Sequence, residues 1–450
     1  MSPPIFSEAP IVATETSSAR PLSNPALRYA LGLLFVIYTL NFIDRQIVNV
    51  LAELIKKDLG LRDWQIGAMT GLAFAVFYTL LGLPIARLAE RWDRPLIISG
   101  SILAWSAFTA ACGTAASFVQ FALYRVGVGA GEAGCTPTAH SLISDYAPKE
   151  KRASALALFS AGSSMGSVCG MAIGGVVADA LGWRAAFYVV AVPGLLIGIL
   201  AALTLPEPRR QLKRAVTPAD APRFVDVLRD LARSPTYRLF SAAGVIIALV
   251  SYSHGAFSAS FFMRNHFAGL QALGALVGLQ PLGILGLISG VSAGAGGISG
   301  ALVGGWLADR MTRKDSRGYA TLAAIGALLT VPPYLAAMMI DSTPLALACL
   351  FPASFAFAFI LGPMYAVPQS IVPPHSRATA TAVFLFMTNL FGLGLGPLGV
   401  GIASDLLQSQ LAMGPGEAIR VAQIFATLLG FLAVWFYWLA RKTIAEEMVS

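Results

Sequence analysis

Long apolar segments dominate this chain, and they limit how it can fold more than any other feature. A helix needs about 20 mostly apolar residues to cross a bilayer, and twelve segments of the 450-residue chain meet that requirement. Only 12% of the residues are charged, whereas soluble domains carry about 25%. The sequence therefore predicts an all-α membrane protein with twelve transmembrane helices, at 28–52, 65–88, 95–116, 118–146, 152–179, 184–205, 238–263, 282–308, 318–340, 344–371, 377–405 and 418–440.

The distribution of Lys and Arg predicts how these helices are oriented. With the N-terminus in the cytoplasm, the cytoplasmic segments carry 23 of the 31 basic residues and the outer segments carry 6. Cytoplasmic loops of membrane proteins are enriched in Lys and Arg, so both termini are expected in the cytoplasm. The same rule explains the net charge of +8 without a nucleic-acid partner. We expect a multi-pass protein of a bacterial-type inner (plasma) membrane.

Composition divides the chain into five parts. Residues 1–27 are rich in Pro, Ser, Ala and Thr and are expected to be a disordered tail. Residues 28–205 and 238–441 each hold six apolar segments, and 442–450 form a short C-terminal tail. The polar stretch 206–237 separates the halves as a cytoplasmic linker. Within it "APRFVDVLRDLARSP" is either a short amphipathic helix on the membrane surface or a plain linker.

Three short motifs recur about 220 residues apart, which indicates an internal repeat. "AERWDRP" is echoed by "GGWLADRMTR", "PKEKRA" by "PPHSRA", and "GGVVAD" by "GVGIASD". Two such repeats imply two similar six-helix bundles related by an axis along the membrane normal. The first two motifs lie at cytoplasmic helix ends, where an acid can meet the positive N-terminus of a facing helix. They predict a cytoplasmic latch, although anchoring by positive charge alone is the alternative; the candidate gating residues are Glu90, Arg91, Arg94, Asp309, Arg310, Arg313, Arg152 and Arg377.

These motifs together resemble those of the major facilitator superfamily over residues 28–442. The helix-four motif Arg-x-x-x-Gly-x-Gly is present as Arg125, Gly129 and Gly131. Within the superfamily, "NFIDRQIVNVLAELIKKDLGL" and "RVGVGAGEAGCTPTAHSLISDYAPKEKRA" are similar to the spinster type. The resemblance implies alternating access, a cavity lined by helices one and four, and export of sphingosine phosphate or lysophospholipids.

Four charged residues lie within the apolar segments away from their ends: Asp44, Arg45, Arg125 and Glu132. Such residues are costly in lipid and usually serve function. The family arrangement makes Asp44 the nearest partner for Arg125. A carboxylate that alternates between an Arg and a proton couples transport to protons, so Asp44, Glu132 and Arg125 are the candidate coupling residues; a static ion pair is the alternative. We expect the Asp44 side chain to point into the cavity. Arg45 is expected to have a structural role and to point towards Glu132 or another neighbour. The reverse, with Arg45 in the cavity, is the alternative.

Substrate binding is assigned to polar residues near this cluster and in the second half. Arg125 would hold an anionic head group, with Asp44 beside it, and Phe and Met side chains of the second half would contact an alkyl tail. Further hydrogen bonds are expected from Tyr38, Asn41, Thr381 and Asn389. His254 and His140 are either structural or part of a proton relay.

The preferred hypothesis is a proton-coupled secondary transporter that exports an amphipathic, lipid-like anion. An importer of a small organic anion and a non-transporting membrane sensor are the alternatives. The sequence has no phosphate-binding loop, metal cluster or hydrolase motif, so we expect no enzyme activity, no cofactor and no metal. The expected partners are the anion, protons and membrane lipids, and the chain is expected to be a monomer.

Overall fold

The computed structural model describes residues 24–89, 92–148, 151–208, 224–312, 315–373 and 376–448. Over these ranges the chain forms helices joined by short loops, and none of the described residues is in a β-strand. Eleven of the described helical segments are long and apolar enough to cross a membrane. The all-α membrane fold expected from the apolar segments is confirmed.

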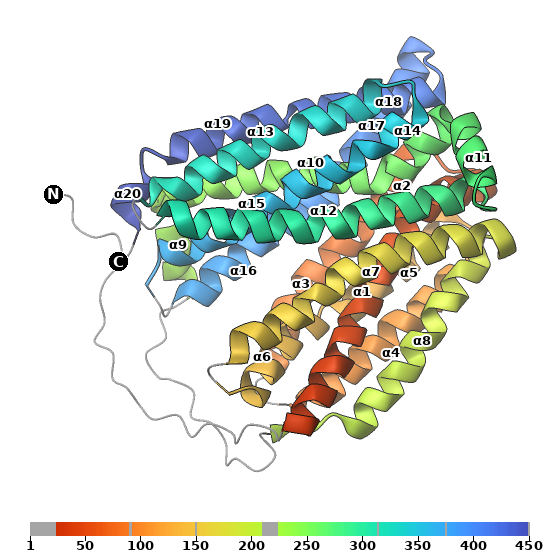
Figure 1. The fold of residues 1–450 in the computed structure, drawn as a ribbon. Helices are drawn as coiled ribbons and strands as arrows, with labels where there is room; N and C mark the ends of the chain where they lie inside the picture. Colours follow the sequence, from red (N-terminus) through yellow and green to blue (C-terminus); the bar gives the residue numbers. More distant parts are fainter. Residues whose placement is uncertain are drawn as a thin grey trace.

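The first group of helices holds the N-terminal half of the chain (Figure 1). Its members are α1 (Asn24–Leu59), α2 (Asp63–Gly67), the π-helical η1 (Ala68–Leu72), α3 (Ala73–Leu88), α4 (Arg94–Cys112), α5 (Phe118–Glu132), α6 (Cys135–Tyr146), α7 (Arg152–Leu181) and α8 (Trp183–Thr204).

The second group begins after the linker. It comprises α9 (Phe224–Arg233), α10 (Pro235–Asn265), α11 (Phe267–Ala275), α12 (Pro281–Thr312), α13 (Arg317–Met339), α14 (Thr343–Ala348), α15 (Leu350–Ser370), α16 (Arg377–Met387), the π-helical η5 (Thr388–Leu395), α17 (Gly396–Leu411), α18 (Pro415–Leu428), α19 (Gly430–Ala440) and α20 (Ile444–Glu447).

The segment expected as one helix over 118–146 is divided into α5 and α6, of 15 and 12 residues. Pro137 lies in the first turn of α6. It cannot donate the backbone hydrogen bond that would reach Ala133, so the helix is interrupted there. The interruption follows directly on Glu132, the last residue of α5.

The linker stretch "APRFVDVLRDLARSP", for which the sequence allowed either a helix or a plain linker, contains the helix α9. Val227 and Leu231 are buried in a cluster with Tyr237 of α10, whereas Val225 is 63% exposed. The helix therefore packs on the second group through the face that carries Val227 and Leu231.

The two helix groups lie side by side and touch mainly through α7 with α12 and α2 with α17. Glycines bring the backbones together there: a Cβ on Gly286 would lie 2.2 Å from the Met171 carbonyl oxygen, and one on Gly67 would lie 2.2 Å from that of Pro397. One apolar cluster spans both groups and includes Leu51 near the end of α1. With the orientation predicted from the distribution of basic residues, this shared packing lies at the outer end of the molecule.

Candidate functional site

A cavity of about 730 Å³ lies between the two helix groups. Its walls come chiefly from α1 and α7 of the first group and from α10, α12 and α15 of the second. Because both groups contribute, a molecule held in the cavity contacts both of them. A rocking movement of one group against the other would change the surroundings of that molecule.

The cavity is lined by two of the four membrane-embedded charges, Arg45 and Arg125. Arg45 Nε donates a hydrogen bond to Glu132 Oε2 at 2.7 Å, which forms an ion pair between α1 and α5. The Glu132 side chain is fully buried, and neither Glu132 nor Asp44 lines the cavity. Both arginines thus contribute to the cavity wall, whereas the two carboxylate residues do not.

Aromatic rings surround the two guanidinium groups. Arg45 Cζ lies 4.6 Å from the ring centroid of Tyr78, 4.9 Å from that of Phe74 and 5.2 Å from that of Phe42. Arg125 Cζ lies 5.2 Å from the same Phe74 ring. A cation over an aromatic face is attracted by the ring quadrupole, so Phe74 helps to hold both arginines at the cavity wall.

The expected ion pair between Asp44 and Arg125 is not present. Asp44 is buried, and its Oδ1 has no hydrogen-bond partner among the described residues. Trp105 and Thr109 of α4 lie beside it without forming a well-aligned hydrogen bond. Neighbouring residues of a helix differ in direction by about 100°, so Asp44 turns towards α4 when Arg45 turns towards Glu132 and the cavity. The expectation that Asp44 faces the cavity is wrong in this conformation.

Two glycines of α5 allow the close packing that buries this cluster. A Cβ on Gly129 would lie 2.6 Å from the Phe74 carbonyl oxygen, and one on Gly131 would lie 2.7 Å from the Trp105 backbone nitrogen. Helix α5 therefore touches the backbones of α3 and α4. This contact excludes lipid from the charges on α5.

Of the residues assigned to substrate binding, only Arg125 lines the cavity. Tyr38 instead stacks on Phe159, with ring centroids 4.3 Å apart. Asn41 is buried beside Glu132 without a well-aligned hydrogen bond. Thr381 donates its hydroxyl to the Arg377 carbonyl oxygen, and Asn389 lies in η5 outside the cavity wall.

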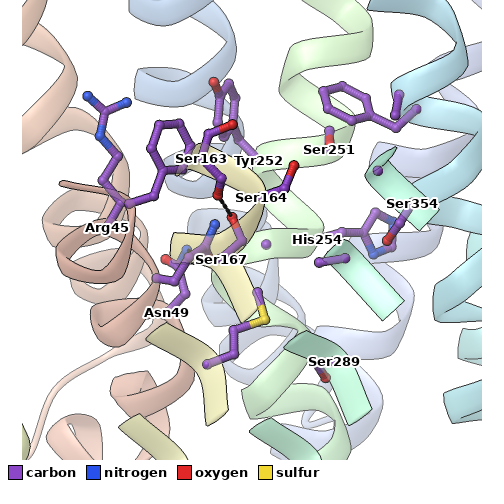
Figure 2. A pocket seen from close by; sticks show the side chains of 18 of the residues that line it. Arg45, Asn49, Ser163, Ser164, Ser167, Ser251, Tyr252, His254, Ser289 and Ser354 are labelled. Carbon is purple, nitrogen blue, oxygen red and sulfur yellow. Dashed lines mark hydrogen bonds between the residues drawn. The ribbon is translucent and has the colours of Figure 1, made fainter. Parts of the chain in front are cut away.

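The polar groups that do line the cavity are mostly serine hydroxyls that were not predicted from the sequence. Four serines of α7 recur at helical spacing in the cavity wall, and helices of the second group add four more. Figure 2 labels Ser163, Ser164, Ser167, Ser251, Ser289 and Ser354 among them. That spacing over 154–181 was the available signal. The eight serines are Ser160, Ser163, Ser164, Ser167, Ser251, Ser258, Ser289 and Ser354.

The candidate cytoplasmic latch does not join the two groups in this conformation through the described residues. Arg94 is fully buried and pairs with Glu207 at 2.5 Å and Asp145 at 2.7 Å, all within the first group. Arg152 Nε donates to the Ala147 carbonyl oxygen, again within the first group. Asp309, Arg310 and Arg377 are exposed, and Glu90, Arg91 and Arg313 lie outside the described residues.

The opposite, outer end is joined by a buried polar network around Asp63 at the start of α2. The Asp63 carboxylate accepts hydrogen bonds from Lys56 Nζ at 2.6 Å, from Arg264 Nη2 at 2.7 Å and from Ser404 Oγ at 2.7 Å. Arg264 Nη2 also donates to Glu53 Oε2 at 2.8 Å. Arg264 and Ser404 belong to the second helix group, so the network closes the outer end.

The repeated acids Asp179 and Asp405 occupy equivalent positions in this closure. Asp405 accepts hydrogen bonds from the backbone nitrogens of Asp63 and Trp64, at 3.1 and 2.8 Å. Asp179 accepts one from the Gly283 backbone nitrogen at 2.6 Å. In each case an acid of one group binds the N-terminal turn of a helix of the other, where backbone N–H groups are unpaired and the helix dipole favours negative charge.

A helical membrane protein with a cavity between two helix groups, closed at one end by contacts between them, has the architecture of a secondary transporter. The model of the Major Facilitator Superfamily matches residues 34–397. The chain belongs to this superfamily and is of the spinster type, so it is a membrane transporter and not an enzyme.

Three comparisons illustrate the relationship. The chain is 32% identical over 449 residues to an MFS-type efflux pump of Mycolicibacterium smegmatis, covering 98% of this chain and 99% of the relative. It is 28% identical over 424 residues to mouse protein spinster homolog 1, covering 89% and 77%. A crystal structure of a bacterial homologue of the human lysosomal transporter spinster, in an inward-facing and unoccupied conformation, superposes with a TM-score of 0.83 at 32% identity, covering 95% of this chain and all of that one.

Proposed function

We propose that the protein is a proton-coupled secondary transporter that exports an amphipathic, lipid-like anion by alternating access. The observation that carries this proposal is the order of charges at the cavity wall. Arg45 and Arg125 form part of the cavity wall, whereas Glu132, which pairs with Arg45, is fully buried and does not line the cavity. The efflux activity named for the mycobacterial relative supports the direction of transport.

Competition for Arg45 would couple the anion to a proton. A phosphate or carboxylate that binds the Arg45 guanidinium weakens its ion pair with Glu132. A buried carboxylate without a partner is strongly unfavourable, so the released Glu132 takes up a proton. Asp44, already without an ion-pair partner among the described residues, would hold a second proton for the same reason. In this scheme the anion and the proton bind together.

Because the anion and the proton bind together in this scheme, import of a small organic anion is a second candidate function. When the anion and the proton bind together, an inward proton gradient drives uptake, and export requires an outward gradient of the anion. The eight serines of the cavity wall could bind the hydroxyl groups of a polar acid. The head group and the direction of flux separate the two candidates.

Flux in reconstituted lipid vesicles tests both. Lauroyl lysophosphatidic acid and glucuronate would be supplied to protein oriented one way, with the proton gradient imposed in either direction. Export of the lysolipid that is faster than in vesicles with Arg45→Gln supports the first candidate. Glucuronate uptake that rises with an inward proton gradient supports the second. A flux of either compound that does not change with the imposed proton gradient would contradict proton coupling.

We also propose that the exposed Asp309, Arg310 and Arg377, with Glu90, Arg91, Arg313 and Arg152, latch the cytoplasmic end when the outer end opens. The closed outer network around Asp63 supports this, because alternating access requires the two ends to close in turn. The buried Arg94 is tied to Glu207 and Asp145, so its role would be to fix the first group as a rigid body.

A further inference from the structure

His254 stands across the cavity from Arg45, on α10 of the second helix group (Figure 2). Its side chain lines the cavity although the residue is only 2% exposed. The imidazole stacks face to face on Tyr334, with ring centroids 3.8 Å apart and planes 6° apart. The ring is therefore held in one plane beside the cavity.

A short hydrogen-bond chain determines which nitrogen of His254 carries the proton. His254 Nε2 lies 2.7 Å from Thr427 Oγ1, and the Thr427 hydroxyl donates to the Gln423 carbonyl oxygen at 2.7 Å. A threonine has one hydroxyl hydrogen, so Thr427 must accept from His254. Nε2 therefore carries the hydrogen, and Nδ1 of the neutral ring is an acceptor.

This acceptor is left without a partner. Nδ1 of His254 is buried and forms no hydrogen bond with any described residue. A buried polar atom without a partner costs about 1–3 kcal/mol, and such atoms in native proteins call for an explanation. The nearby serines of the cavity wall, Ser251 and Ser354, do not donate to it.

We propose that His254 Nδ1 is a substrate contact that accepts a hydrogen bond from a donor group of the transported molecule. The substrate would then carry two recognised groups: an anion at Arg45 and a hydroxyl, amine or amide N–H at His254. Because Nδ1 is covered in this conformation, the contact forms when the helices close around the bound molecule. The inference rests on the proposed function for the anion, but the donor contact stands on the His254 geometry alone.

Binding of three detergent-solubilised probes to the purified full chain tests the contact. Lauroyl lysophosphatidylglycerol carries a phosphate and several hydroxyl groups, dodecyl phosphate carries the anion alone, and monolaurin carries hydroxyl groups without an anion. His254→Gln can keep an N–H towards Thr427 but lacks an acceptor at the Nδ1 position, whereas His254→Asn can place its amide oxygen near that position. Thermal unfolding and gel filtration show whether each variant is folded.

We expect the loss of affinity to be selective for the probes that carry hydroxyl groups. His254→Gln should weaken binding of both hydroxylated probes about tenfold, the effect of one hydrogen bond, and leave dodecyl phosphate binding within about twofold. His254→Asn should retain most of the affinity. Equal losses for all three probes, or no binding of either hydroxylated probe to the unmodified protein, would overturn the inference. If monolaurin shows the effect but Arg45→Gln does not weaken dodecyl phosphate binding, the donor contact stands and the proposed anion site fails.

Discussion

Arg45 separates Glu132 from the cavity: its Nε bonds to Glu132 Oε2 at 2.7 Å, while the same side chain forms part of the cavity wall. Any anion that reaches Arg45 therefore acts on Glu132 through a single side chain. The pair joins α1 to the end of α5, immediately before the break at Gly134. A change in this contact is thus placed to alter how two helices of the first group meet.

Replacing Glu132 by Gln should remove the proton-dependent part of transport. The amide keeps the size of the side chain and can still accept a hydrogen bond from Arg45, but it cannot exchange a proton. We expect substrate affinity to become independent of pH between 5 and 8, because Arg45 no longer has a charged competitor. Binding of lauroyl lysophosphatidylglycerol across that pH range measures this, because its phosphodiester keeps one negative charge throughout, whereas a phosphate monoester would itself titrate. Asp58→Asn, which alters an exposed ion pair with Arg184, is the matched control and should keep the dependence of the unmodified protein.

Replacing Asp44 by Asn should separate coupling from binding. Asp44 does not line the cavity, so we expect substrate affinity within about twofold of the unmodified protein, as for substitutions outside the contact surface. Flux driven by a pH gradient should fall, because Asp44 is proposed to carry the second proton while Glu132 still carries the first. Flux in vesicles and binding in detergent are measured on the same preparation. Proton-driven transport by Asp44→Asn at the rate of the unmodified protein would contradict a coupling role for this residue.

The positions of the helices were predictable because each depends on local composition. A run of about 20 apolar residues has few alternatives to a membrane-spanning helix, and all but one of the twelve expected segments is recovered as a spanning helix. The exception is the segment 118–146, in which the helix is interrupted ahead of Pro137. This segment contains Arg125 and Glu132. The sequence therefore departs from the simple rule at the segment that holds the charges.

The direction of each charge could not be predicted, because it depends on the partner helices. Asp44 and Arg45 are adjacent, and sequence alone does not say which of them points into the cavity. That choice is made by Glu132, Phe74 and Tyr78, which hold Arg45 at the wall. The outer network was missed for the same reason, since Asp63 and Ser404 meet only after α2 packs against α17.

Replacing Arg264 by Gln should open the outer end. Removing one partner of a buried ion pair costs about 3–5 kcal/mol, and here both Glu53 and Asp63 lose their shared partner. We expect the cavity to become accessible from outside. A cysteine introduced by Asn49→Cys in the cavity wall, with the four native cysteines replaced, should then react faster with an impermeant maleimide applied from the outer side.

The control for Arg264→Gln is Arg184→Gln. Arg184 pairs with Asp58 on the outer surface of the first group, and both side chains are more than two-fifths exposed, at 42% and 44%. An exposed ion pair contributes about 0–1 kcal/mol, so labelling at residue 49 should be nearly unchanged. Equal labelling rates for the two variants would show that the Asp63 network does not hold the outer end closed.

Replacing Gly401 by Ala should prevent tight closure of the outer end without removing any charge. A Cβ on Gly401 would lie 2.4 Å from the Asp63 carbonyl oxygen and 2.7 Å from Trp64 Cα, both backbone atoms that cannot move aside alone. Helix α17 must therefore shift away from α2, and the same maleimide reaction should become faster. Gly399→Ala in the same helix has open space around its Cβ and should label like the unmodified protein. Slow labelling in both variants would mean that the contact between α2 and α17 can relax without opening the cavity.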